Sequence, residues 1–294
     1  MTFKKMRWCV LALLATPLLV AAQSPVSGFM QGKGRGSVVV SFSTEKYDEV
    51  FLVPEKIEGV PVFNEVETNS FSLYGTYGIS DKLDLVVNAP YISTQGAATD
   101  ATLADLGYEN ERKGLQDLAL HLKYRAANID FGSSSLGLLG TVGVQTPLGN
   151  YKVDEGLQSI IAIGNRSTSI NAIAAAHFQT ESGVFATAQG GYSFRSNDVP
   201  SAFISEFKVG YAARRFYVDA YVAGQLSSKD GVDILQEGFT GVFPATRVNY
   251  TRVGASVFVP VAGGFGVAGG GSVYVAGRNL GQSTAFYGAV VYSF

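Results

Sequence analysis

The chain is poor in charge and almost free of cysteine and tryptophan, and each shortage narrows the class of protein. Charged residues make up 16% of its 294 positions, whereas soluble domains carry about a quarter. This deficit fits a protein whose outer surface faces hydrocarbon and whose charges are confined to loops and an interior. The single cysteine, Cys9, and the single tryptophan, Trp8, both lie near the N-terminus. Beyond them the chain has no disulfide and no thiol chemistry.

The first residues have the pattern of a secretory signal peptide. Lys4, Lys5 and Arg7 precede an apolar run at residues 10–22 that ends in small residues. The run is shorter than the roughly 20 residues of a transmembrane helix, so an uncleaved anchor is the weaker alternative. We predict a signal peptide at residues 1–22 and a single domain at residues 23–294.

The charge balance and the spacing of polar residues argue against several partners. The formal net charge is -2 and the mature chain has no clustered basic stretch, so no nucleic-acid partner is expected. Paired carboxylates and metal-ligand spacings are not readable in the sequence. We therefore expect no cofactor and no metal site.

What the chain does have is an alternation of apolar and polar residues with a period of two, which predicts β-strands. A strand needs only about 9 to 11 residues to cross a bilayer, and lipid tolerates no unpaired sheet edge, so such strands must close into a barrel. We predict an all-β, antiparallel up-and-down transmembrane barrel of about twelve strands, with ten or fourteen as alternatives. The predicted strands are residues 33–43, 69–79, 82–93, 113–126, 135–148, 167–179, 183–195, 203–212, 215–227, 247–260, 264–276 and 283–294.

Short and long connections alternate between these strands. Ser80-Asp81 and Ala213-Arg214 are short, whereas residues 44–68 and 228–246 are long. Bacterial outer-membrane barrels have short periplasmic turns and longer extracellular loops. We therefore predict a protein embedded in the lipid of the outer membrane of a Gram-negative bacterium, with its C-terminus on the periplasmic side.

The same alternation assigns side chains to the two faces of the wall. At residues 117–125, leucines and Tyr124 share one face, while charged residues and His121 share the other, which must face water. We expect the inner face to tune permeation or to form internal ion pairs, and both readings stay open. The predicted lumen-lining residues are Asp84, Asp117, His121, Lys123, Arg125, Arg195, Glu206, Lys208, Asp219 and Arg252.

Aromatic residues mark the strand ends and the end of the chain. Outward rings near one rim, Tyr77, Tyr124 and Tyr211 among them, are typical of the aromatic girdle at a membrane boundary. In the last predicted strand Phe286, Tyr292 and Phe294 share the outward face. A terminal strand of this kind indicates recognition by the barrel-assembly machinery, which we expect as a transient partner.

Three stretches of sequence resemble a known family. Residues 71–91, residues 114–125 and the turn Thr146-Pro147-Leu148-Gly149 are similar to the outer-membrane family named for the meta-pathway of phenol degradation. Gln116, where a glycine is usual, and the wider turn at residues 147–149 depart from its pattern. The resemblance implies a channel for small, often aromatic or hydrophobic, solutes and brings no catalytic residues.

The lumen of such a barrel needs a constriction, and two other functions remain open. About twelve strands enclose a space between the filled interior of eight strands and the wide channel of sixteen. Residues 23–32 are too short for a plug domain, so we predict a constriction by the acidic first loop, which contains Glu45, Asp48, Glu49, Glu55, Glu58, Glu65 and Glu67. The alternatives are a structural or adhesive barrel whose lumen is filled by ion pairs, and an outer-membrane enzyme. The enzyme would need a lipid-facing Ser and His pair, whereas His121 and His177 have inward parity.

Overall fold

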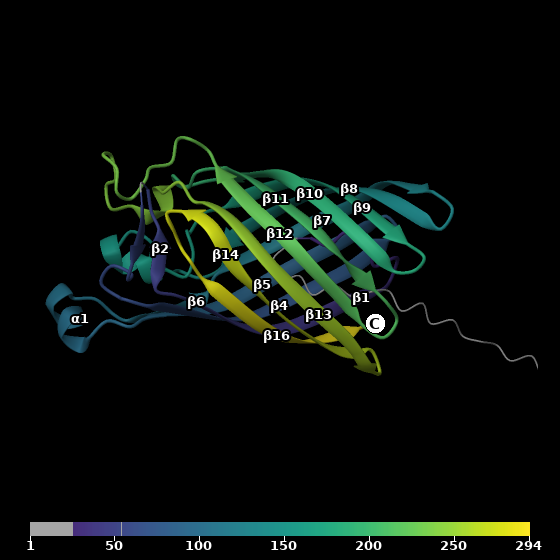
Figure 1. Cartoon of the computed structure of the whole chain (residues 1–294), viewed down its shortest axis with the longest axis horizontal. Coiled ribbons are helices and arrows are strands. Elements are labelled where there is room, and N and C mark those ends of the chain that lie inside the picture. Colours follow the sequence, from purple (N-terminus) through teal and green to yellow (C-terminus); the bar gives the residue numbers. More distant parts are fainter. Residues whose placement is uncertain (1–25, 54) are drawn as a thin grey trace, which may run out of the picture.

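The computed structural model describes residues 26–53 and 55–294, so the predicted signal peptide lies outside the described residues. Most of the described chain is one antiparallel β-sheet that curls into a barrel (Figure 1). Its wall strands are β1 (Gly36–Tyr47), β4 (Val66–Ser80), β5 (Leu83–Gly96), β6 (Glu111–Leu115), β7 (Asp117–Asp130), β8 (Ser134–Pro147), β9 (Ser169–Thr180), β10 (Val184–Arg195), β11 (Ala202–Ala212), β12 (Tyr217–Ser227), β13 (Asn249–Ala262), β14 (Phe265–Arg278) and β16 (Thr284–Ser293).

The sheet closes on itself, because β1 pairs with both β4 and β16. Strands β6 and β7 are two segments of one wall strand, since both pair with β5 and only Gln116 separates them. The wall therefore has twelve strands, which confirms the predicted closed antiparallel barrel. The predicted strand at residues 113–126 was wrong in being continuous. Its register with β5 shifts by one residue at Gln116, beside Pro90, which has no N–H to give to a ladder.

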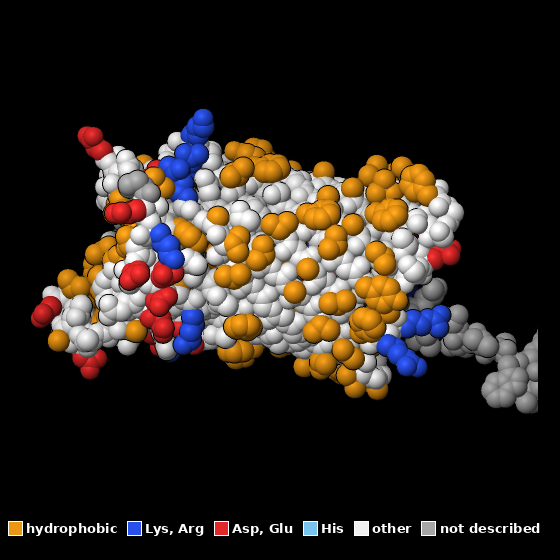
Figure 2. Space-filling model, in the orientation of Figure 1, with side chains coloured by type: hydrophobic (Ala, Val, Ile, Leu, Met, Phe, Trp, Pro, Cys, Tyr) orange, Lys and Arg blue, Asp and Glu red, His pale blue; other side chains and the backbone are white. Residues whose placement is uncertain are grey.

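Side chains alternate across the wall as the sequence pattern requires. On β7, Asp117, His121 and Lys123 are buried inside the barrel, while Leu120 and Leu122 are exposed on its outside. Figure 2 shows the result: apolar side chains cover the body of the barrel and charged ones gather at its two ends. An apolar belt between polar rims is the surface that a bilayer solvates.

The two ends of the barrel differ, and we call them the turn end and the loop end (Figure 1). The turn end holds Phe294 and the short connections at residues 81–82, 131–133, 181–183, 213–216 and 263–264. The loop end holds residues 48–65, 97–110, 148–168, 196–201, 228–248 and 279–283.

The long loops form a folded cap over the loop end, which the sequence did not predict. Its elements are β2 (Glu49–Phe51), β3 (Lys56–Glu58) and β15 (Leu280–Gly281), which pair with one another, with α1 (Asp100–Leu106), η1 (Gly156–Ile161) and η2 (Phe243–Ala245). A small apolar core of Val60, Phe63, Val66, Leu103 and Ile161 joins three of these loops. None of the helices in the described part of the chain is long and apolar enough to cross a membrane.

Candidate functional site in the barrel lumen

Residues 26–35 enter the lumen from the turn end, contrary to the expectation that residues 23–32 are too short to act as a plug. At the rim the Gly34 N–H donates to the Gly78 carbonyl at 2.8 Å. Further inside, the Gln31 N–H donates to Asp84 Oδ2 at 3.1 Å. The first wall strand therefore begins at Gly36, three residues later than predicted. We call residues 26–35 the N-terminal segment.

A buried ion pair holds this segment against the wall. Lys123 Nζ lies 3.1 Å from Asp84 Oδ2, and the two side chains are 2% and 0% exposed. The same ammonium donates to the carbonyls of Ser27, at 3.2 Å, and of Phe29. Because an ammonium has three N–H groups, these three partners satisfy it fully. The segment is thus part of the coordination that makes a buried charge on Lys123 tolerable.

Phe29 is the apolar anchor of the segment. Its ring centroid lies 4.2 Å from that of His177, 5.1 Å from that of Phe185 and 6.5 Å from that of Tyr217. Around these rings the lumen is filled by buried apolar side chains that also include Val26, Val39, Tyr74, Val86, Phe258 and Val291. The turn half of the lumen is therefore filled by apolar packing, whereas the alternation predicted a polar lumen.

Close approach of the segment to the wall requires a glycine. A Cβ atom on Gly28 would lie 2.4 Å from His177 Nδ1 and 2.8 Å from Thr187 Oγ1. These two wall atoms are themselves hydrogen-bonded at 2.8 Å. Any side chain at position 28 would therefore push the segment inward or separate His177 from Thr187.

A cavity of about 460 Å³ occupies the loop half of the lumen. Its walls come from β4, β5, every strand from β7 to β13, and loop residues such as Asn165, Val199 and Pro244. A smaller cavity of about 80 Å³ shares Ile204 and Tyr250 with it and reaches Gln189. The Gln189 side chain donates to the Val26 carbonyl at 3.4 Å. The cavity system thus extends from the loop half of the lumen to the N-terminal segment.

Three of the predicted lumen residues line the larger cavity, and none of them forms an ion pair with another described residue. Arg195 donates to Gln225 Oε1 at 2.7 Å, to Ser193 Oγ at 3.3 Å and to the Pro200 carbonyl at 3.4 Å. Asp117 accepts from Tyr151 Oη at 2.5 Å and from Gln145 Nε2 at 3.0 Å. Nε2 of His121, a residue that is 4% exposed, has no hydrogen-bond partner within the described chain.

The remaining predicted lumen residues lie on the inner face but not together. Arg252 is bound by Glu45 at 3.3 Å, so one acidic residue of the region predicted to constrict the lumen does reach inside. Lys208 and Glu206 lie 3.7 Å apart on β11. The other contacts are local: Asp219 Oδ2 accepts from Ser256 Oγ at 2.6 Å, and Arg125 donates to the Asp81 carbonyl at 2.9 Å at the turn end.

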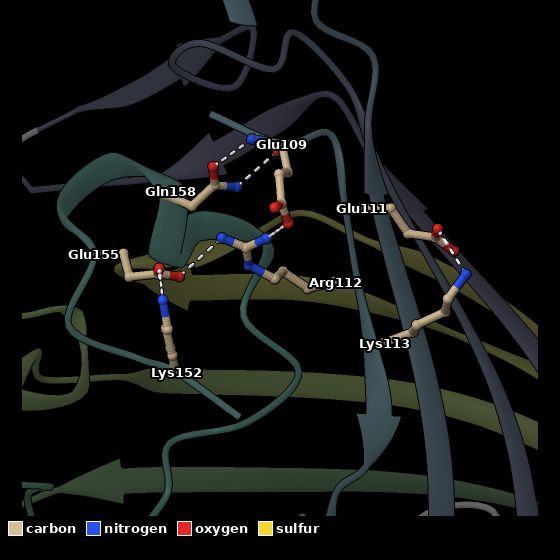
Figure 3. Close-up of polar contacts among 7 residues, drawn as sticks. All are labelled: Glu109, Glu111, Arg112, Lys113, Lys152, Glu155 and Gln158. Atoms are coloured by element: carbon tan, nitrogen blue, oxygen red, sulfur yellow. Dashed lines mark hydrogen bonds and ion pairs between the residues drawn. The ribbon is translucent and has the colours of Figure 1, made fainter. Parts of the chain in front are cut away.

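A charged network in the cap joins two loops (Figure 3). Arg112 lies between Glu109 and Glu155, and Nη2 is 3.0 Å from Glu155 Oε2. Lys152 Nζ is 3.1 Å from the other oxygen of Glu155. Partial burial acts to raise the pKa of Glu155, but hydrogen bonds from Lys152 and Arg112 outweigh it and hold this pKa below its ordinary value. The network fastens the loop at residues 148–168 to the start of β6.

The sequence comparison identifies the family to which this barrel corresponds. A family model described as "Putative MetA-pathway of phenol degradation" matches residues 56–288. The chain belongs to this family. No curated protein matches the chain.

Solved structures share the barrel fold. The COG4313 outer membrane channel from Pseudomonas putida F1 superposes with a TM-score of 0.69 at 17% identity, covering 92% of this chain and 99% of that one. The KdgM porin in complex with disordered oligogalacturonate gives 0.48 at 5% identity, covering 87% and 99%. The translocator domain of the autotransporter NalP from Neisseria meningitidis gives 0.46 at 10% identity, covering 88% of each chain.

The family match leaves part of the described chain outside its bounds. It begins at residue 56, so the N-terminal segment at residues 26–35 and the whole of β1 precede it. The missed plug had no periodic signal, because the segment forms no strand. Only the glycines at positions 28, 32 and 34 and the isolated Phe29 distinguish it in the sequence.

Proposed function

We propose that the protein is an outer-membrane channel for small solutes, with the turn end and Phe294 facing the periplasm. The apolar belt supports a membrane location, and the alternation of short turns with long loops supports this orientation. Phe286, Tyr292 and Phe294 are exposed on the outside of the last strand, where the barrel-assembly machinery would read them.

The observation that carries the proposal is the nature of the barrier across the lumen. On its loop side lies a cavity of about 460 Å³, and the barrier combines inward side chains of the wall with a separate segment, residues 26–35, that is held by noncovalent contacts. Barrels with only structural roles can fill their interior with side chains of the wall alone. A barrier made of a separate segment can move while the wall stays intact.

The solute class follows from the family and from the size of the cavity. The family description refers to phenol degradation, and a volume of about 460 Å³ suits a monocyclic compound. We propose small aromatic solutes, whose passage the predicted lumen residues tune.

The filled-barrel alternative requires the inner charges to pair across the lumen. Arg252 does so with Glu45, but Arg195 binds only neutral oxygens and Arg125 binds a backbone carbonyl. The enzyme alternative requires a lipid-facing histidine, whereas His121 and His177 are both buried in the lumen. The filled-barrel alternative therefore gains the Arg252–Glu45 pair but no such pair at Arg195 or Arg125 within the described residues.

Planar-bilayer recording of the refolded mature chain, with and without phenol, tests the channel proposal. We expect intermittent openings, as the segment leaves and returns, and a decrease in current when phenol is present. A variant changed only on the outer wall, Gly288→Ala, is the control, since a Cβ there meets no atom within 4 Å. A folded barrel that stays closed at all voltages would contradict the proposal.

A further inference from the structure

We propose that the larger cavity is a binding site for small organic monocarboxylates that also carry a hydroxyl group, with Arg195 as the anchor for the carboxylate. This inference deepens the proposed channel function and rests on it for the biological role of the site.

The first observation is a guanidinium inside the barrel without a counter-ion. Arg195 uses three N–H groups on neutral oxygens of Gln225, Ser193 and Pro200, and within the described residues no carboxylate lies at ion-pair distance from it. Arg195 is half-buried, and a charge that has lost part of its hydration is normally paired, because neutral dipoles replace only part of the loss. A guanidinium with two further N–H groups on a cavity wall is suited to bind a carboxylate by its planar fork.

The second observation is a set of hydrogen-bond acceptors on β7, on another part of the cavity wall. Asp117 is held by Tyr151 and Gln145 and faces the cavity with its negative charge unneutralised by any cation at ion-pair distance in the described chain. Four residues further along β7, His121 also lines the cavity, and its buried Nε2 has no hydrogen-bond partner in the described chain. The His121 ring fits there because its neighbour on β8 is Gly143, where a Cβ would lie 2.1 Å from His121 Cδ2.

The register fixes how these groups are arranged. Arg195 pairs with Ser169, Ser169 pairs with Gln145, and Gln145 pairs with Ala119, two residues from Asp117. Three strand spacings therefore separate Arg195 from β7, roughly 14 Å along the wall before side chains reach inward. The wall between the charges offers the uncharged hydrogen-bonding groups of Ser169, Asn171 and Gln145.

A ligand that satisfies this wall needs a negative group at one end and a hydrogen-bond donor at the other. The carboxylate binds Arg195, and the hydroxyl donates to Asp117. A second carboxylate at the far end would meet the like charge of Asp117, so a dicarboxylate is disfavoured. A purely hydrophobic solute would leave all of these polar groups unpaired, at a cost in affinity.

The test uses 4-hydroxybenzoate as the probe in equilibrium dialysis against the folded mature chain at neutral pH and constant chloride. Neutral 4-hydroxybenzyl alcohol should bind about tenfold more weakly or worse, because it lacks the charge-assisted bonds to Arg195. Equal binding of the two compounds would overturn the proposal without any mutation. A detergent-only dialysis corrects for uptake into micelles.

Variants locate the site. Arg195→Gln should weaken 4-hydroxybenzoate binding about tenfold or more, Arg195→Lys should weaken it less, and Arg214→Gln, on an exposed turn, should leave it unchanged. Asp117→Asn should weaken 4-hydroxybenzoate but leave benzoate unaffected. Each variant is first checked for the folded barrel by its heat-modifiable gel mobility. Unchanged affinity in folded Arg195→Gln would overturn the assignment.

Recording from the same preparations separates this inference from the channel proposal. Conductance without specific binding of 4-hydroxybenzoate would refute the site and leave the channel standing. Specific binding in a barrel that never conducts would support the site and refute the channel.

Discussion

Lys123 and Asp84 form an ion pair of 3.1 Å inside the barrel, and the ammonium completes its coordination with backbone carbonyls of the N-terminal segment. The pair therefore does two things at once: it links β5 to β7 and it fastens the segment in the lumen. A buried pair whose partners depend on a third element couples the stability of the wall to the position of that element.

Removing one partner of this pair should destabilise the protein strongly. Lys123→Met leaves the Asp84 carboxylate buried and uncompensated, and we expect a loss of about 3 to 5 kcal/mol in the free energy of unfolding. The double variant Lys123→Met/Asp84→Asn should recover part of this loss, with a coupling of about 1 to 3 kcal/mol in a double-mutant cycle measured by urea unfolding in detergent. Strictly additive effects would mean that the two side chains do not act as a pair.

Truncation of the apolar anchor should free the segment without harming the wall. Phe29→Ala removes a ring packed between His177, Phe185 and Tyr217, which costs about 3 kcal/mol, or on the order of a hundredfold in the docking equilibrium. The open time in single-channel recordings should rise accordingly. Lys33→Ala is the matched control, since the Lys33 side chain is exposed and only its backbone N–H is bonded. If Phe29→Ala and Lys33→Ala behave alike, the ring does not anchor the segment.

A side chain at position 28 should open the channel by steric exclusion. In Gly28→Ala the new Cβ would lie 2.4 Å from His177 Nδ1 and would collide with it. The N-terminal segment therefore cannot dock against the barrel wall. The second-site change His177→Ala should restore part of the closure in the double variant, because it removes the colliding ring but leaves Thr187 Oγ1 at 2.8 Å from the new Cβ. Single-channel recording of the single and double variants checks this. A double variant that stays as open as Gly28→Ala would argue against docking of the segment on His177.

Acid should loosen the cap at the loop end. The pKa of Glu155 lies below its ordinary value, and that of Asp233 is lowered by the hydrogen bond from Arg278, against the effect of burial. Because both groups are depressed in the folded state, their contribution is present above the ordinary carboxyl pKa and is lost as the pH falls through the folded value. The protection of residues 148–168 against hydrogen exchange, taken relative to the intrinsic exchange rate at each pH, should therefore fall below about pH 4. In Glu155→Gln the exchange should already be fast at neutral pH and should change less on acidification.

Much of the wall could be predicted from the sequence, because a lipid-facing strand leaves a direct pattern. Leu120 and Leu122 alternate with His121 and Lys123, and only one register puts the first pair in lipid. The same rule could not predict the turn half of the lumen. Val39, Val86 and Phe185 are apolar on the inner face because they pack on the N-terminal segment, and their contacts are specified by a partner distant in the chain.

The cap and the cavity could not be predicted from the sequence, for related reasons. The apolar residues of the cap, such as Phe63 and Ile161, come from separate loops without a shared period, so nothing in either loop indicates the other. Gln116 was noted as an unusual residue, but its place at the break between β6 and β7 depends on pairing with Pro90 and its neighbours. The inward parity of Arg195 was readable, whereas its lack of a counter-ion depends on the whole lumen.

The most direct test of the account is the single-channel conductance of a chain that lacks residues 23–31, compared with the full mature chain under the same conditions. This deletion removes Phe29 and the carbonyls that bind Lys123, and it keeps Gly34 at the rim. The account predicts a folded barrel with larger and longer openings than those of the full chain. A folded, truncated barrel with the conductance of the full chain would contradict the claim that the N-terminal segment closes the lumen.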